Sequence, residues 1–212
     1  MTITKALPIS KIREIKINEN NEPLISIVES EKLIFLKEHK FLMPLLRKSV
    51  SDLLTQASQN LPEGYKILVV TAYRPLWMQR KLWKNRLWQM AKKYPFKMIF
   101  NYSNWKREVG KYTSPPGGSS HQCGAAVDVT LLDSNNNRID MGTTLTDFGE
   151  KVNTYSEQIS AEQKENRKIL LDAMTKVGFI NYPLEWWHFS YGDRMWAAYS
   201  EKTECFYGPM NN

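Results

Sequence analysis

The chain contains three histidines, His39, His121 and His188, and two of them lie near acidic residues in the sequence. His121 and Asp128 belong to the segment SSHQCGAAVD, while Glu185 and His188 belong to EWWH. Neutral imidazole and carboxylate groups are both good ligands for zinc. The two segments together therefore predict a metal site built from His121, Asp128 and His188.

The spacing within each segment requires an irregular backbone. His121 and Asp128 are an odd number of positions apart, so an unbroken strand would point them to opposite faces of a sheet. Gly124 lies between them and can supply a bulge or bend. For the second segment we expect Glu185 in a turn and His188 on the strand that follows, so that both can face one pocket.

This set of residues is suited to hydrolysis. Two histidines and one carboxylate leave a fourth coordination position open for water, which is typical of catalytic rather than structural zinc. A nearby glutamate that does not bind the metal, Glu185, can accept the proton of that water. A hydrogen-bonded cluster without metal is the simpler alternative for the same four residues.

The two segments resemble the SxHxxGxAxD and ExxH motifs of the VanX-like D-alanyl-D-alanine dipeptidases, members of the LAS (M15) zinc D,D-peptidases. A third segment, LPEGYKILVVTAYRP, is similar to the strand of that family that ends in Tyr-Arg-Pro. The resemblance covers roughly residues 40–192. It implies D-Ala-D-Ala as the substrate and one Zn²⁺ per chain, with Glu185 as the general base and the ligands His121, Asp128 and His188.

The resemblance also implies roles around the metal. Arg74 matches the arginine that steadies the substrate carbonyl, where a guanidinium can stabilise the developing oxyanion. Arg74 could instead tie the end of its strand to a carboxylate. Ser119 matches the motif serine, which can hydrogen-bond the substrate, and Trp187 is the tryptophan we expect to line the cleft. Most other tryptophans should lie in the core, and Cys123 is better explained as a small buried thiol than as a fifth ligand.

One departure from the family pattern concerns the substrate. The family has a Met-Gly-Thr-x-Phe-Asp-like element after the first metal strand, whereas this chain places Leu145 and Thr146 at the Phe and Asp positions. In the dipeptidases an acidic residue in this region helps to hold the substrate ammonium group, and Asp147 could take that role through a register shift. The alternatives are a D,D-carboxypeptidase that trims peptidoglycan stem peptides, or a non-catalytic wall-binding or metal-sensing module.

The patterns along the chain predict the elements that must position these residues. Together with the resemblance they imply an α+β fold of the LAS/hedgehog type, with helices packed on one side of a central antiparallel sheet. We expect a single domain over residues 1–212, with an N-terminal arm at 1–29 that holds one or two short edge strands. The remaining expected elements are a helical segment from Ser30, helices at 46–57, 75–93 and 160–177, strands at 66–73, at 121–132 and from Trp186, a turn at 133–137 and a long loop at 94–118.

Composition sets limits on partners and location. The formal net charge is +7, but no run of five basic residues or nucleic-acid motif occurs, so we expect a spread, solvated basic surface and no nucleic-acid partner. His39 should be a surface residue, and Cys123 and Cys205 form no CxxC pair. No apolar run reaches the length of a membrane span or signal peptide. This predicts a soluble protein, cytoplasmic unless a signal peptide has been removed, in which case periplasmic or secreted; the oligomeric state is left open.

Overall fold

The computed structural model describes residues 4–37, 43–110 and 114–210. At its centre is a five-stranded sheet in the order β3-β5-β6-β8-β7. Its strands are β3 (Leu33–Phe35), β5 (Lys66–Thr71), β6 (Ala126–Leu132), β7 (Ile180–Asn181) and β8 (His188–Ser190). The β3–β5 pair is parallel and the other three pairs are antiparallel. The α+β class with a mainly antiparallel central sheet is therefore confirmed.

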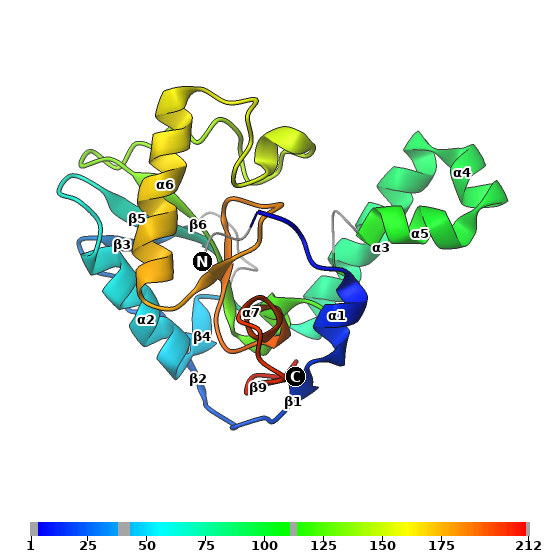
Figure 1. The fold of residues 1–212 in the computed structure, drawn as a ribbon, viewed down its shortest axis with the longest axis horizontal. Helices are drawn as coiled ribbons and strands as arrows, with labels where there is room; N and C mark the ends of the chain where they lie inside the picture. The colour runs from blue at the N-terminus through cyan, green and yellow to red at the C-terminus, as the bar shows by residue number, and fades with distance from the viewer. Residues whose placement is uncertain (1–3, 38–42, 111–113, 211–212) are drawn as a thin grey trace.

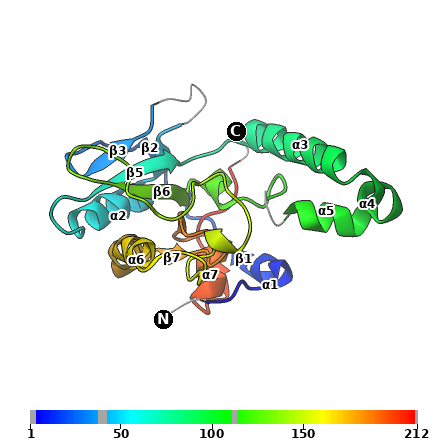
Figure 2. The same ribbon diagram turned by 90° about the horizontal axis from the view of Figure 1, so that it is seen from above.

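Two long helices cover one side of this sheet, as Figures 1 and 2 show. They are α2 (Lys48–Gln59) and α6 (Ala161–Lys176), which contact each other. Leu54 of α2 and Leu170 of α6 are fully buried in the main core. All seven residues of β6 are buried, so this strand is enclosed on both faces and forms a rigid base for side chains at its start.

Several predicted elements are confirmed. The helices expected at 46–57, 75–93 and 160–177 correspond to α2, α3 (Leu76–Lys93) and α6. At the start of α6, Ser160 and Gln163 form the expected capping box, and Gly178 follows its end with φ of 103°. The strand expected at 66–73 is β5, and the turn expected after residue 132 brings Arg138 back to Leu132.

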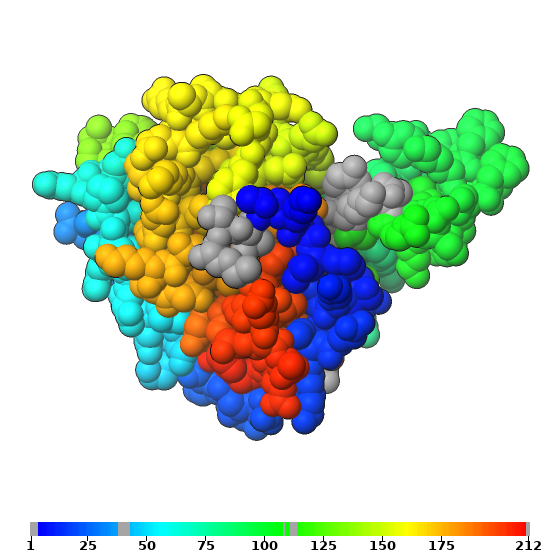
Figure 3. Space-filling view, viewed as in Figure 1, coloured from blue at the N-terminus to red at the C-terminus, as the bar shows by residue number. Residues whose placement is uncertain are grey.

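The loop predicted at 94–118 is wrong over much of its length. The chain there forms α4 (Pro95–Phe100) and α5 (Tyr102–Gly110), while residues 111–113 lie outside the described part. The aromatic residues that hid the helical period pack against α3, where Trp83, Trp105 and Val109 form a small core of their own. We call α3, α4 and α5 together the helical arm. It projects from one side of the molecule in Figures 1 and 3.

The helical segment predicted from Ser30 is also wrong before Lys48. Its described residues form β3 and β4 (Leu45–Arg47), because β3 can pair with β5 and β4 with β2 (Leu24–Ser26). Pairing with distant strands here overrides the local preference. His39 lies among residues 38–42, outside the described part.

The expected N-terminal arm contains the predicted short strands. They are β1 (Lys16–Ile17) and β2. β1 pairs in parallel with β9 (Glu204–Cys205). The sequence patterns missed α1 (Ile9–Glu14), which packs on α7 (Arg194–Tyr199). None of the helices in the described part of the chain combines the length and apolarity that crossing a membrane would take.

A buried arginine holds the segment that follows β6 and its turn. Arg167 of α6 is 3% exposed and donates hydrogen bonds to the carbonyls of Met141 (2.8 Å), Asn153 (2.7 Å) and Lys151 (2.9 Å). Burial lowers its pKa to about 10, and nearby Asp140 partly offsets this. Arg167 therefore holds both ends of the segment 141–153, which we call the cleft loop, against α6.

Replacing this arginine should loosen the cleft loop. Arg167→Met leaves three carbonyls without their donor, and we expect a loss of about 3 kcal/mol in the free energy of unfolding, measured by urea denaturation. Lys168→Met next to it is the control, because Lys168 is exposed and forms an ion pair with exposed Asp172, so the change should stay within about 0.5 kcal/mol. Equal destabilisation by the two variants would contradict this account.

Candidate active site

The register of the central strands brings two of the predicted ligands together. Asp128 on β6 is the direct antiparallel partner of His188 on β8, so their side chains leave the same face of the sheet. On the other side of β6, Asp128 is paired with Thr71 of β5 across a register shift that begins after Val69. The chain beyond Thr71 leads to Arg74, which borders the same face.

His121 reaches this face through the irregularity that the sequence predicted. It lies in a short 3₁₀ helix, η1 (Ser120–Cys123), rather than on the strand expected from residue 121. Gly124 ends η1 in the left-handed conformation with φ of 65°. A Cβ atom at Gly124 would lie 2.3 Å from the Leu24 side chain, so the position favours glycine both for its φ and for space.

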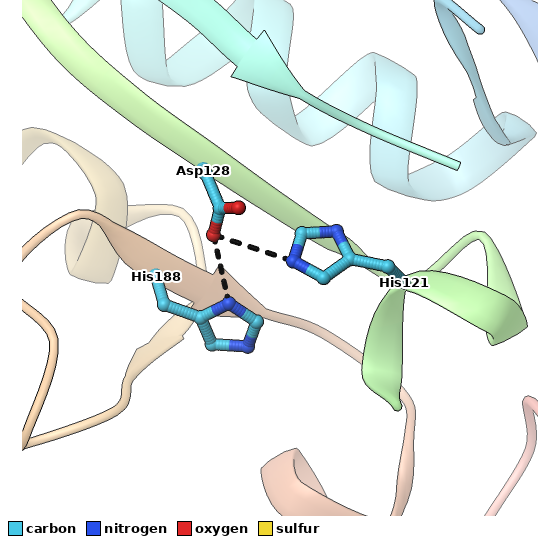
Figure 4. A group of neighbouring side chains, drawn as sticks. All are labelled: His121, Asp128 and His188. Carbon is cyan, nitrogen blue, oxygen red and sulfur yellow. Dashed lines mark hydrogen bonds and ion pairs between the residues drawn. The ribbon is translucent and has the colours of Figure 1, made fainter. Parts of the chain in front are cut away.

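Figure 4 shows how His121, Asp128 and His188 converge. One oxygen of Asp128, Oδ1, lies 3.3 Å from Nε2 of His121 and 2.9 Å from Nδ1 of His188. The three potential ligand atoms lie within 4.8 Å of one another. In the part of the chain that the structure describes, this is the group of His, Cys, Asp and Glu side chains that could hold a metal ion.

The protonation of His121 and Asp128 suits a bound cation, whereas Asp128 raises the pKa of His188 against the effect of burial. His121 donates a hydrogen bond from Nδ1 to the Ala72 carbonyl at 2.9 Å, which leaves Nε2 with its lone pair facing Asp128 when the ring is neutral. Burial lowers the pKa of His121 even though Asp128 opposes this, and the histidines hold the pKa of Asp128 low against the effect of its own burial. A neutral imidazole and an ionised carboxylate then present lone pairs to each other. A cation between them would relieve this repulsion, and two nitrogens with one oxygen are a donor set that zinc accepts.

Glu185 lies in the expected turn, and β8 begins at His188 rather than at Trp186. Glu185 borders the same cleft and is partly exposed. Burial raises the pKa of Glu185 to about 7 and Asp128 adds to the rise, whereas His188 and Arg74 oppose it. A carboxylate with a pKa near 7 is matched to accepting and returning a proton at neutral pH.

Asn181 shapes the turn that carries Glu185. Its side-chain amide donates to the carbonyls of Glu185 (3.2 Å), Trp186 (3.3 Å) and His188 (3.0 Å). Thr154, which follows the cleft loop, in turn donates to the Asn181 side-chain oxygen. No sequence signal identified Asn181, because its role depends on contacts between residues that an isolated strand pattern does not reveal.

Arg74 lies just beyond the end of β5. Its contacts fit both interpretations drawn from the sequence, an arginine that faces the substrate and one that pairs with a carboxylate. Its guanidinium lies 3.9 Å from Oδ2 of Asp128 and donates to the side chain of Gln79 at 3.0 Å. Gln79 is fully buried and donates to the Ser114 carbonyl, so it orients Arg74. Arg74 also borders the cleft. The sequence patterns did not single out Gln79.

The three predicted substrate-binding residues all border this cleft, in different settings. Ser119 is 4% exposed and precedes η1. Trp187 is 5% exposed and belongs to the main core, so it forms part of the wall rather than a free surface. Asp147 is exposed on the cleft loop, and its carboxylate accepts a hydrogen bond from the Thr144 backbone at 2.7 Å. Cys123 is buried in the core and burial raises the pKa of its thiol.

Comparison with known proteins identifies the family. The model of the D-Ala-D-Ala dipeptidase family, which belongs to the M15 peptidases, matches residues 39–208. The chain belongs to this family. It is therefore a D,D-peptidase and a hydrolase, as its motifs predicted.

Curated relatives agree with this family. The chain is 28% identical to a D-alanyl-D-alanine dipeptidase of Synechocystis sp. over 226 aligned positions, covering 90% of each protein. It is 29% identical to a D-alanyl-D-alanine dipeptidase of Escherichia coli K12 over 174 positions, covering 81% of this chain and 75% of the relative. Among solved structures, the LdcB LD-carboxypeptidase has a TM-score of 0.49 at 21% identity, covering 93% of this chain and 78% of that one.

The raised pKa of Glu185 predicts a pH-dependent cost in the metal-free protein. The pKa is about 7 in the folded chain against an ordinary value of 4.5, so folding loses stability as pH rises from 4.5 to 7 and the full cost persists above that. Glu185→Gln removes the charge. We expect it to stabilise the metal-free protein at pH 8 by roughly 1–2 kcal/mol, a value reduced for the exposure of Glu185 to the cleft.

Urea unfolding in the presence of a chelator, at pH 8 and again near pH 4.5, measures this difference. The two proteins should differ much less in free energy of unfolding at the lower pH, where the carboxyl group is protonated in the folded chain and about half protonated in the unfolded chain. A stabilisation by Glu185→Gln that does not depend on pH would contradict the electrostatic explanation.

Proposed function

We propose that the protein is a zinc-dependent D,D-dipeptidase that hydrolyses D-Ala-D-Ala. The observation that carries the proposal is the convergence of His121, Asp128 and His188, whose potential ligand atoms lie within 4.8 Å of one another, in the same cleft as Glu185 and Arg74. A non-catalytic metal-sensing module would need the three ligands alone. The presence of a carboxylate with a pKa of about 7 beside them favours catalysis.

In this proposal each side chain has one task. His121, Asp128 and His188 would hold one Zn²⁺, which when bound lowers the pKa of water and polarises a peptide carbonyl. Glu185 accepts a proton from the attacking water and returns it to the departing amine. Arg74 faces the carbonyl oxygen as it gains negative charge, and Gln79 keeps the guanidinium in place.

In this arrangement Arg74 can pair with Asp128 and also bind the substrate carbonyl. Its 3.9 Å distance to Asp128 is longer than a direct hydrogen bond, so this ion pair leaves guanidinium N–H groups available to a ligand. Burial lowers the pKa of Arg74 while Asp128 and Glu185 raise it. An arginine remains charged even with such a shift, and its low-dielectric surroundings strengthen its attraction for a developing oxyanion.

The dipeptide is proposed as the substrate because two relatives are named D-alanyl-D-alanine dipeptidases and Asp147 offers a carboxylate at the cleft. A free dipeptide carries an ammonium group close to its scissile bond, which an acidic residue on the cleft loop can bind.

The second candidate is a D,D-carboxypeptidase. The observations that favour it are the size of the cleft, about 1120 Å³, and the partial use of the Asp147 carboxylate by the Thr144 backbone.

Catalysis and metal binding should separate in two variants. Glu185→Ala removes the proton acceptor, so we expect hydrolysis of D-Ala-D-Ala to fall by roughly a hundredfold to ten-thousandfold with zinc content unchanged. His121→Ala removes a ligand and should reduce both. Zinc content by atomic absorption and release of D-Ala are the measurements. If Glu185→Ala cleaves at the wild-type rate, the proposed mechanism is wrong.

The choice between the two substrates depends on Asp147. We expect the wild-type enzyme to cleave the free dipeptide faster than a stem pentapeptide, and Asp147→Asn to raise KM for the dipeptide by about twofold to fivefold, the effect of one exposed ion pair. Cleavage of the pentapeptide should not change. Asp172→Asn is the matched control, because Asp172 is an exposed acid on α6. Faster cleavage of the pentapeptide by the wild-type enzyme would favour the carboxypeptidase.

A further inference from the structure

The helical arm projects from the rest of the molecule and has a small core of its own. Trp83 of α3 packs against Trp105 and Val109 of α5, and all three are buried. The short helix α4 connects the two long sides at the end farthest from the sheet, as Figure 1 shows. The segment from Lys92 to Tyr102 forms the outer end of the arm, which we call the arm tip.

Exposed large apolar side chains are concentrated on this arm. Seven of the eleven exposed large apolar residues among those described belong to α3, α4 and α5. At the arm tip, Phe96 is 73% exposed, Ile99 is 66% exposed and Phe100 is 81% exposed. Exposed apolar groups of this size in a contiguous stretch indicate an interaction surface.

The net positive charge of the chain is concentrated on the same arm. The expectation of a basic surface spread over the whole molecule is therefore wrong. Residues 76–110 carry nine of the 29 lysines and arginines but one of the 22 acidic residues, a local net charge of +8. The rest of the chain sums to −1. At the arm tip itself Lys92, Lys93 and Lys97 are all exposed beside the apolar residues.

We propose that the arm tip binds the surface of a membrane that contains anionic lipids. Phe96, Ile99 and Phe100 would enter the boundary between headgroups and acyl chains, while Lys92, Lys93 and Lys97 contact lipid phosphates. Aromatic and aliphatic groups ringed by lysines are the features that hold proteins at a bilayer surface without crossing it. This role adds to the proposed peptidase function and does not depend on it.

Charge and shape favour lipid over the other occupants of such a surface. A second copy of the chain would bring two arms of +8 together, and like charges at an interface oppose association. Nucleic acid would satisfy the lysines and could stack on phenylalanines, but an exposed isoleucine between them offers no stacking face. The arm tip is also a projecting end rather than a groove, which suits insertion into a yielding surface.

The orientation follows from the same distribution of charge. The part of the molecule outside the arm has almost no net charge, so an anionic surface attracts the arm first. The arm's inner side borders the cleft through Leu82, Asn85 and Gln89 of α3, whereas the arm tip lies beyond those residues. Binding at the arm tip therefore leaves the cleft open to substrate in solution.

Vesicle co-sedimentation of the full chain tests the proposal. The probes are vesicles of phosphatidylglycerol and phosphatidylcholine in equal parts, and vesicles of phosphatidylcholine alone. We expect binding to the first and not the second, weakened by added salt. Lys92→Gln/Lys93→Gln/Lys97→Gln should lower the apparent affinity by roughly a hundredfold, and Phe96→Ser/Phe100→Ser by at least about tenfold.

Matched variants elsewhere on the surface separate a local effect from a general one. Lys151→Gln/Lys164→Gln/Lys176→Gln removes the same charge from exposed positions outside the arm, and Val28→Ser removes an apolar group that is 72% exposed. Both should bind anionic vesicles as the wild type does. Unchanged circular dichroism and thermal unfolding of each variant establish that the fold is intact.

Three outcomes would overturn the proposal. They are equal binding to neutral and anionic vesicles, equal loss of binding in the tip and control lysine variants, and no vesicle binding at all. In the last case, dimers by light scattering that the tip variants abolish would assign the arm tip to self-association, and capture of single-stranded DNA would assign it to nucleic acid. Loss of peptidase activity plays no part in this test, so it remains independent of the proposed function.

Discussion

The candidate site depends on one cross-strand pair, Asp128 opposite His188. Because β6 and β8 are antiparallel and in this register, the two side chains emerge together on one face. A shift of one residue in either strand would send one of them to the opposite face and separate the ligands. The enclosed strand β6 makes such a shift costly, since all seven of its residues would exchange buried environments. Hydrophobic packing of the sheet thus sets the geometry of a polar site.

Around this pair the remaining groups are positioned by backbone features rather than by regular structure. His121 arrives through a 3₁₀ turn that ends at Gly124, Glu185 through a turn held by Asn181, and Arg74 through the chain beyond the register shift in β5. Irregular segments place functional groups at angles that strands and helices do not offer. Each of them is tied to the core by hydrogen bonds, which keeps the groups in fixed positions.

The sequence singled out residues that the structure brings together in one cleft, but it described the elements around them less well. The odd spacing between His121 and Asp128 already required a break, and Gly124 provides it. Helices such as α6 were predictable because a capping box and an apolar stripe are local signals. The helices α4 and α5 were missed because some of their apolar residues are buried in a small core and others are exposed. The apolar residues therefore do not follow a single helical periodicity. β3 was missed because its conformation is fixed by β5, which lies far along the chain.

Hydrogen bonds from side chains to distant carbonyl groups could not be predicted from the sequence, because they too depend on the assembled fold. Asn181, Gln79 and Arg167 are polar residues whose burial becomes visible only when the fold is assembled. A buried polar group must be satisfied by partners, but the sequence does not say which ones. In this protein these three residues hold the elements that surround the cleft.

The pairing of β1 with β9 has a consequence for how the protein is made. Lys16 on β1 meets Glu204 on β9, a partner 188 residues later in the chain. Until that partner has been synthesised, β1 has no strand to join, and α1, which borders the cleft through Ile9, Ile12 and Arg13, also waits for its support on α7. Contacts between such distant segments form late because closing a long loop is entropically costly. β8, which carries His188, precedes β9 by a short segment. The same late part of the described chain therefore completes both the candidate metal site and this wall of the cleft.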